Sequence, residues 1–179
     1  MKRSSISVPY GYEPPEETRK GTLIFYDTFE QITDEELEAA ADLVQKLDFK
    51  KLVLYPLHEE TVRRMSKEAV RAYHKREQQL YDWKNNSSHS GVVVEGFEGK
   101  RKKYTPLEAA LRHLTDKYAS PYFLYVSPET ANQIAAYSSF EEWIVKLRLL
   151  LPREPQHLHP NLEKYRHRWK TVRESLIKE

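Results

Sequence analysis

Residues 21–57 read GTLIFYDTFEQITDEELEAAADLVQKLDFKKLVLYPL, and this stretch decides the fold. Thr22–Tyr26 is a short β-branched and aromatic run between a glycine and an aspartate, which predicts a strand. A helix is predicted to begin at Thr33, because Glu36 follows three residues later and completes a capping box. Leu52–Tyr55 is a second apolar run and predicts a second strand. Two strands joined through a helix imply a parallel pair with a right-handed crossover.

The loop at 27–33 connects the first predicted strand to the first predicted helix. It therefore lies at the carboxyl end of the strand and at the amino end of the helix, where open α/β sheets place their ligands. We expect any binding site to be centred on this loop.

The segment DTFEQITDEE at 27–36 resembles the strand-one signature of nucleotidylyltransferases, G-[ST]-F-D-P-[HT]-x-G-H with one apolar residue before the [HT] position. Thr28 and Phe29 match this pattern, and Glu30 is a conservative replacement for its aspartate. Thr33 matches the threonine variant of phosphopantetheine adenylyltransferases. The resemblance implies a divergent member of this superfamily, similar to the phosphopantetheine and nicotinamide-nucleotide adenylyltransferases, with these residues as candidates for nucleotide or phosphate binding.

Four positions depart from the signature. Asp27 replaces the first glycine, Gln31 the proline and Glu35 the second glycine. Glu36 replaces the final histidine, which in the family binds the phosphates and steadies the charge that builds during nucleotidyl transfer. A carboxylate repels what the histidine attracts, so we predict that the fold is kept and ordinary adenylyl transfer is lost.

A second segment, AAYSSFEEWIVKLRLLLP, resembles the family's loop I-S-S-[ST]-x-x-R, which precedes a helix that holds the triphosphate. Ser138 and Ser139 match the serine pair, while Trp143 replaces the arginine. Lys146 lies about one turn further and is a candidate to reach inward. The alternative interpretation is a core helix that needs no ligand, with Ser139 and Glu142 as its capping box.

A run of cations follows the third predicted strand, Gly91–Phe97. Its members are Lys100, Arg101, Lys102 and Lys103. In a parallel sheet they would emerge on the same rim as the loop at 27–33, where they could hold phosphate or an acidic partner. The alternative is a basic turn that faces solvent.

The remaining elements follow from apolar periodicity and helix-start signals. Further helices are expected at Ser66–Trp83, at Pro106–Tyr118 with Thr105 and Glu108 as a capping box, and at Asn161–Lys178. A fourth strand is expected at Tyr122–Val126. The prediction is a three-layer, Rossmann-like α/β fold with a mainly parallel sheet of four or five strands and helices on both faces. The family's strand order would place the first and fourth strands side by side.

Composition bounds the domains and partners. We expect an N-terminal arm at 1–20, a nucleotidylyltransferase-like domain at 21–150, and a linker with a basic C-terminal helix packed on the domain at 151–179. The chain has no cysteine, which excludes disulfides and thiolate metal sites. It has no apolar stretch long enough to span a bilayer and no apolar secretory segment, so we predict a cytoplasmic protein without a membrane partner. The net charge of +2 disfavours nucleic acid as a partner.

Histidines give no metal-site signal. His58 is followed by two glutamates, but this pattern is equally typical of a helix start. His157 and His159 lie in a proline-rich linker, where histidines are usually exposed. No second ligand spacing supports either group, so no metal site is predicted.

Three functional hypotheses follow. The leading one is a nucleotidylyltransferase-like protein without ordinary adenylyl transfer, which keeps a cleft for a nucleotide or a phosphorylated small molecule or serves as a binding protein. It assigns no catalytic residue, names ATP or another nucleotide with magnesium as the candidate cofactor, and leaves the oligomeric state open. The second is an active transferase with a divalent cation held by Glu30, Glu35 or Glu36. The third is a protein- or RNA-interaction module that uses the basic C-terminal helix.

Overall fold

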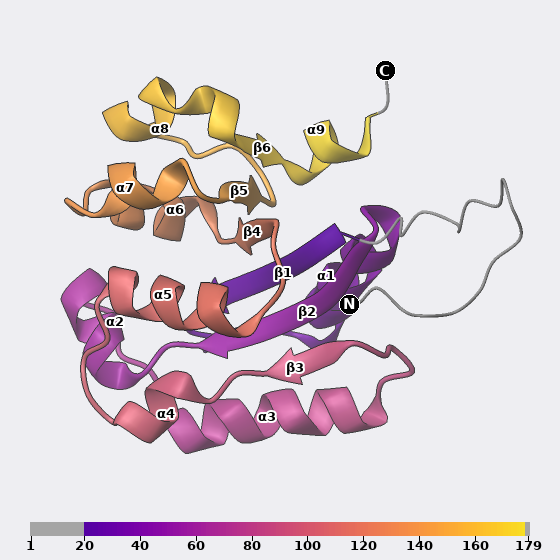
Figure 1. The fold of residues 1–179 in the computed structure, drawn as a ribbon. Coiled ribbons are helices and arrows are strands. Elements are labelled where there is room, and N and C mark those ends of the chain that lie inside the picture. The colour runs from indigo at the N-terminus through magenta and orange to yellow at the C-terminus, as the bar shows by residue number, and fades with distance from the viewer. Residues whose placement is uncertain (1–19, 178–179) are drawn as a thin grey trace, which may run out of the picture.

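The computed structural model describes residues 20–177. Its centre is a six-stranded sheet with the order β3-β2-β1-β4-β5-β6, in which all paired strands are parallel (Figure 1). The strands are β1 (Lys20–Asp27), β2 (Phe49–Pro56), β3 (Val92–Val94), β4 (Tyr122–Tyr125), β5 (Arg148–Leu151) and β6 (Trp169–Thr171). The order reverses between β1 and β4, so the topological switch point lies in the middle of the sheet.

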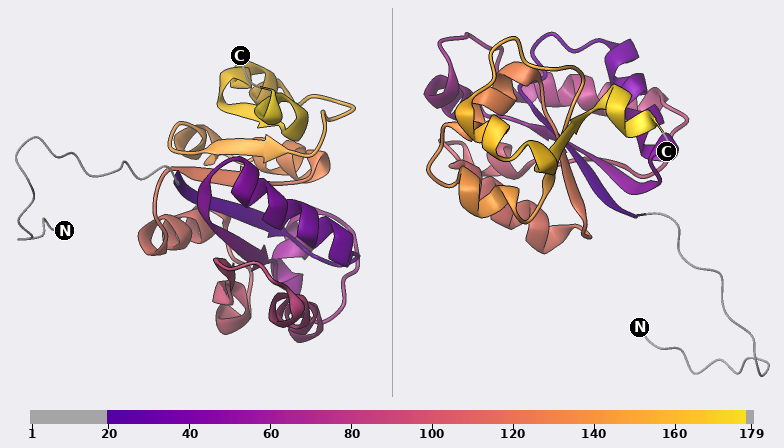
Figure 2. Two further views of the ribbon diagram at one scale, coloured as in Figure 1. Left: turned by 90° about the vertical axis from the view of Figure 1, so that its right-hand side faces the viewer. Right: turned by 90° about the horizontal axis from the view of Figure 1, so that it is seen from above.

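Helices cover both faces of the sheet (Figure 2). One face packs against α2 (Glu59–Met65), α5 (Leu107–Lys117), α6 (Pro128–Ala135), α7 (Phe140–Ile144) and α8 (Pro160–Lys164). The other packs mainly against α1 (Asp34–Lys46) and α3 (Tyr73–Asn86). Short helices α4 (Phe97–Arg101) and α9 (Val172–Leu176) follow β3 and β6, and a 3-10 turn spans Arg166–Arg168. The predicted three-layer α/β architecture is confirmed, although the sheet has six strands rather than four or five.

The predicted pairing of the first and fourth strands is also confirmed. Residues 22–25 of β1 lie in register with residues 122–125 of β4. Ile24 and Tyr26 pack on one face of the sheet and Leu23 and Phe25 on the other, as expected for a central parallel strand. Gly21 permits this close approach, because a Cβ at this position would collide with the backbone of Pro121.

Helix α1 begins as predicted. The Thr33 hydroxyl accepts a hydrogen bond from the Glu36 backbone N–H at 3.1 Å, and the Glu36 carboxylate accepts one from the Thr33 N–H at 2.9 Å. These bonds complete the capping box and fix where the β1–α1 loop ends. None of the helices in the described part of the chain is both long and apolar enough to cross a bilayer.

Several predicted boundaries are wrong. The helix predicted over Ser66–Trp83 begins only at Tyr73, because the backbone is not helical at Ser66 or at Ala72. The third strand ends at Val94, and Phe97 already belongs to α4.

The two predicted capping boxes at Thr105 and Ser139 do not form either. The N-cap of α5 is Pro106. Thr105 instead receives a hydrogen bond from Arg101 and donates its N–H to Thr61. Ser139 precedes α7 but makes no capping hydrogen bond.

The C-terminal region differs most from its prediction. Asn161–Lys178 was expected to be one helix, but it contains α8, the 3-10 turn, β6 and α9. Trp169 is 1% exposed and lies in a strand that pairs with β5, and its indole N–H donates to the Leu162 carbonyl at 2.8 Å. The arm predicted at 1–20 lies outside the described residues apart from its last position, which begins β1.

Candidate functional site

A cavity of about 650 Å³ lies beyond the carboxyl ends of β1, β2 and β4, at the switch point of the sheet. Its walls come from the β1–α1 loop, from α2 and the segment that follows it, and from the start of α6. The lining residues are Asp27, Thr28, Glu30, Gln31, Ile32, Glu36, Leu57, Val62, Met65, Ser66, Glu68, Ala69, Ser127, Glu129, Thr130 and Gln133. The loop at 27–33, which the sequence predicted as the centre of a site, therefore forms one wall of this cavity.

Phe29 anchors the β1–α1 loop to the core of the protein. Its backbone has φ of 60°, in the left-handed region that bulky residues seldom adopt. The side chain is 1% exposed and packs edge-on against Phe25 with ring centroids 4.8 Å apart. The structure thus places Phe29 in the core, while Thr28 and Glu30 on either side of it line the cavity.

Arg76 holds the ends of β1 and β2. Its side chain is fully buried, and Nη1 donates to the carbonyls of Thr28 at 2.8 Å and Leu57 at 2.7 Å. Nε donates to the Arg71 carbonyl, and Nη2 lies 3.2 Å from a Glu59 carboxylate oxygen. Burial lowers the pKa of Arg76, and the Glu59 charge opposes this shift. Sequence reasoning missed Arg76, because it stands among other charged residues on α3 and has no distinguishing spacing.

Arg71 fastens the same loop from the outside. Its backbone N–H donates to the Glu30 carboxylate at 2.8 Å, and its Nη2 donates to the Glu30 carbonyl at 2.6 Å. Neither Arg71 nor Arg76 lines the cavity. Their positive charges therefore serve the loop itself rather than a ligand.

The cavity is lined by carboxylates. They are Asp27, Glu30, Glu36, Glu68 and Glu129, and the described lining contains no lysine or arginine. Glu36 and Glu129 lie in the first turns of α1 and α6, where acidic side chains offset the positive end of the helix dipole. These two helix starts would otherwise attract phosphate. The carboxylates of Glu36 and Glu129 therefore offset the positive ends of the α1 and α6 helix dipoles, which a phosphate site could otherwise use.

Asp27 is the last residue of β1, and it lines the cavity. Burial raises its pKa to about 6, against the opposing effect of hydrogen bonds from the backbone N–H groups of Thr28 and Phe29. The nearby charges of Glu36 and Glu68 raise it further. The pKa of Asp27 is therefore raised mainly because burial disfavours its charged form, and the neighbouring carboxylates add to this effect.

The predicted basic run does not reach the cavity. Lys100 and Arg101 end α4, and Lys102 and Lys103 follow it, beyond the edge strand β3. Arg101 donates to the Thr105 hydroxyl and to the Tyr104 carbonyl. The basic run at 100–103 follows β3, and β2 separates β3 from β1 in the sheet. The run and the β1–α1 loop therefore lie at the same rim of the sheet but not next to each other.

The predicted serine loop also lies elsewhere. Ser138 and Ser139 connect α6 to α7, and neither lines the cavity. The Lys146 ammonium lies 4.7 Å from the centre of the Trp143 ring and 3.6 Å from a Glu142 carboxylate oxygen. The structure does not bring these residues together with the β1–α1 loop.

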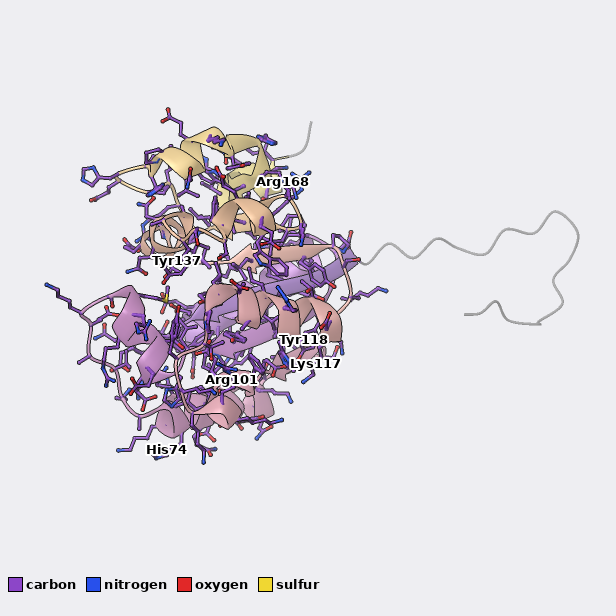
Figure 3. All side chains as sticks on the ribbon, turned by 60° about the vertical axis from the view of Figure 1, so that its left-hand side comes forward. His74, Arg101, Lys117, Tyr118, Tyr137 and Arg168 are labelled. Atoms are coloured by element: carbon purple, nitrogen blue, oxygen red, sulfur yellow. The ribbon has the colours of Figure 1, made fainter. Side chains whose placement is uncertain are left out.

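The cations of the C-terminal region are also largely engaged. Arg168 donates to the backbone carbonyls of Ile144 and Leu147, and Arg166 pairs with Glu154 and Glu174. Figure 3 shows Arg168 far from Arg101, so these cations and the basic run do not form one patch. The continuous basic helix on which the RNA-binding alternative rested is absent from the described residues.

Two buried carboxylates follow β3, and sequence reasoning missed both. Glu98 is fully buried and accepts hydrogen bonds from the Tyr55 hydroxyl, the His58 N–H and the Thr61 hydroxyl, at 2.7 to 2.8 Å. Burial raises the pKa of Glu98, and these hydrogen bonds oppose the shift. Glu98 does not line the cavity. It instead joins α4 to the start of α2.

Glu95 is 3% exposed and accepts hydrogen bonds from Tyr118 at 2.6 Å and Lys117 at 3.0 Å, and His113 lies 3.1 Å away. Lys117 and Tyr118 lie together at the end of α5 (Figure 3). Burial acts to raise the pKa of Glu95, but its hydrogen bonds outweigh burial and lower the pKa. This network fixes α5 to the end of β3.

The cavity does not form a three-ligand metal site. No three of its described carboxylates converge within 4.8 Å. Glu35 does not line the cavity, and Glu30 is engaged by Arg71. The predicted helix-start role of His58 is confirmed, because its ring nitrogen accepts the Glu60 N–H and caps α2.

Comparison with known proteins shows which solved structures share this fold. No protein-family profile matches this sequence, and no curated protein matches it. Among solved structures, the chain is similar to the nicotinic acid mononucleotide adenylyltransferase of Plasmodium falciparum in complex with NaAD, with a TM-score of 0.62 and 12% identity. The match covers 84% of this chain and 74% of that chain. The fold is therefore nucleotidylyltransferase-like, as the sequence resemblance predicted, and at this identity the similarity shows the fold alone.

Proposed function

We propose that this nucleotidylyltransferase-like protein does not catalyse ordinary adenylyl transfer and instead binds a small cationic molecule in the cavity beyond the carboxyl ends of β1, β2 and β4. The observation that carries the proposal is the charge of the walls, which contain five carboxylates and, among the described residues, no lysine or arginine. A triphosphate in such a cavity would meet like charges at short range in a partly enclosed space.

Adenylyl transfer needs positive groups that are already in place around the phosphates, because positioning and charge stabilisation supply most of the catalysis. Glu36 stands where the resemblance places the phosphate-binding histidine, and it lines the cavity. The basic run at 100–103 and the serine pair at 138–139 both lie away from it. The residues that could replace the histidine therefore do not meet at the site.

The rest of the lining suits an amine. Carboxylates bind ammonium groups through charge-assisted hydrogen bonds. The hydroxyls of Thr28, Ser127 and Thr130 and the amides of Gln31 and Gln133 offer further polar contacts, and Leu57, Val62 and Met65 offer an apolar wall. A volume of about 650 Å³ lies within the range of small-molecule sites. An amine with hydrocarbon segments between its charges matches this combination.

The test is calorimetry with spermidine as the cationic probe and with ATP, each with and without magnesium. We expect spermidine to bind with an affinity that falls as salt rises. We expect no ATP binding, and no pyrophosphate release with nicotinic acid mononucleotide or phosphopantetheine as acceptor. ATP binding that requires magnesium and is lost in Glu36→Ala would instead support the metal-assisted transferase. Measured turnover with either acceptor would overturn the proposal.

A double variant ties the binding to the cavity. Glu36→Gln and Glu68→Gln remove two negative charges from the lining, and glutamine can still complete the capping box at Thr33. We expect spermidine affinity to fall about tenfold, on the scale of one good charge-assisted contact. The matched control is Glu163→Gln, an exposed position on α8 outside the cavity. Equal affinity in the double variant and the control would place the binding elsewhere.

A further inference from the structure

A second group of potential ligands lies between α1 and the loop that precedes β3. Glu38 and Asp42 are one helical turn apart on α1, and His89 follows α3 in sequence. His89 Nε2 lies 2.8 Å from a Glu38 carboxylate oxygen and 3.9 Å from an Asp42 carboxylate oxygen. One ligand atom from each of the three side chains lies within 4.8 Å of the others. None of these residues lines the switch-point cavity.

Neighbouring groups hold two of the three side chains in position. The Trp83 indole N–H donates to the second Glu38 carboxylate oxygen at 3.2 Å, which leaves the first oxygen directed at His89. The Trp83 ring stacks on the His89 ring with centroids 6.4 Å apart, and the backbone N–H of His89 donates to the Ser87 hydroxyl at 3.1 Å, which fixes the loop that carries this ring. Such outer contacts orient ligands in metal sites.

An ion pair between Glu38 and His89 does not by itself explain Asp42. The Asp42 carboxylate approaches the same imidazole nitrogen at a distance too long for a hydrogen bond, and it has no other ion-pair partner among the described residues. An adjacent hollow adds the carboxylates of Asp34 and Asp82 beside Glu38, without a lysine or arginine in its described lining. The field on the Glu38 side of the group therefore favours a cation, while His89 shares a separate hollow with Lys50 and Asp48.

We propose that Glu38, Asp42 and His89 bind a divalent transition-metal ion of the zinc class. One imidazole nitrogen and two carboxylate oxygens form a ligand set that zinc and cobalt accept, whereas a site for magnesium or calcium would be built from oxygens alone. Three protein ligands leave a fourth position for water. The side chains of Glu38 and Asp42 are about half exposed, at 46% and 53%, so an ion and its water can enter from solvent.

The experiment titrates the untagged full-length protein with zinc by calorimetry and with cobalt by visible absorption. We expect one ion per chain and a cobalt spectrum of a four- or five-coordinate site. Zinc should also raise the Tm, because the ion would join α1 to the loop before β3 in the folded state only. Absence of a site-specific cobalt spectrum would overturn the proposal.

Two variants and a control separate a metal site from an ion pair. His89→Ala should abolish binding. Asp42→Asn should weaken it at least about tenfold, while the Glu38–His89 pair survives and the metal-free Tm stays close to wild type. His74→Ala, which removes an exposed histidine from α3 (Figure 3), should bind as wild type does. Unchanged affinity in either His89→Ala or Asp42→Asn would overturn the three-ligand site.

Discussion

Two neighbouring regions at the carboxyl rim of the sheet are each held by a buried charge, and the two charges have opposite signs. The ends of β1 and β2 are held by Arg76, and the turn after β3 is held by Glu98. In the first region the unpaired backbone groups are carbonyls, so a donor is required. In the second region the groups to be satisfied are the backbone N–H of His58 and the side-chain hydroxyls of Tyr55 and Thr61, so an acceptor is required. The sign of each buried charge follows from the groups it must satisfy.

The difference determines what each region can offer a ligand. The guanidinium of Arg76 donates its hydrogen bonds to three backbone carbonyls and to the Glu59 carboxylate. The cavity beside it is consequently left with carboxylates and without a cation in its described lining. Glu98 has only neutral hydrogen-bond donors as direct partners among the described residues, and it does not line the switch-point cavity. Substitutions at four positions test this comparison.

Arg76→Leu should have the largest effect. It leaves the carbonyls of Thr28, Leu57 and Arg71 without their donor and leaves Glu59 without its partner. Unsatisfied buried groups of this kind cost about 3–5 kcal/mol of unfolding free energy together. Urea unfolding checks the value, with Lys75→Met on the exposed side of the same helix as the control. A loss below about 1 kcal/mol would mean that the Arg76 hydrogen bonds are not needed to hold the ends of β1 and β2.

Asp27→Asn should have the next largest effect, and in the opposite direction. Because the pKa of Asp27 is raised from 3.8 to about 6, the folded state binds the proton more tightly than the unfolded state. The wild type therefore loses stability as pH rises from about 4 to about 6, and the variant does not.

The gain in Asp27→Asn should thus be near zero at pH 4 and reach at most about 3 kcal/mol above pH 6. Thermal unfolding across this range measures it. Asp116→Asn, on the exposed side of α5, is the control. A gain that is constant with pH would contradict the raised pKa and weaken the argument that the cavity resists negative charge.

Glu98→Gln should cost less, about 1 kcal/mol or below. Burial already disfavours the charge of Glu98, and an amide oxygen can still accept from the His58 N–H and the Thr61 hydroxyl. Glu98→Leu removes all acceptors and should cost about 2–4 kcal/mol. Chemical denaturation of the two variants checks this order. If the two variants lose equal stability, the negative charge rather than the hydrogen bonding holds this turn.

The middle of the sheet could be predicted from the sequence because its signals are local. The apolar runs of β1 and β2 and the capping box at Thr33 each specify their own element. The β1–α1 loop was expected at a ligand-binding position by topology alone, and a cavity lies there. These parts needed no knowledge of distant residues.

The parts that could not be predicted depend on distant partners. Trp169 has helical spacing to its neighbours, but pairing with β5 places it in a strand. Arg76 and Glu98 look like ordinary surface charges until the fold brings backbone groups from β1, β2 and α2 to them. Likewise, the basic run and the serine pair matched plausible local patterns. The strand order separates the basic run from the β1–α1 loop, and the cavity lining shows that the serine pair does not reach it either.

Arg71→Ala should have the smallest effect on stability, below about 1 kcal/mol, because the pair with Glu30 is partly exposed and a backbone hydrogen bond to Glu30 remains. Its effect on the cavity should be clearer. Without Arg71, Glu30 loses its counter-ion while it still lines the cavity, so spermidine should bind a few-fold more tightly. Amide hydrogen exchange at 28–33 reports whether the loop loosens. Tighter binding with unchanged exchange would show that Arg71 sets the charge of the site, whereas faster exchange with weaker binding would show that it mainly orders the loop.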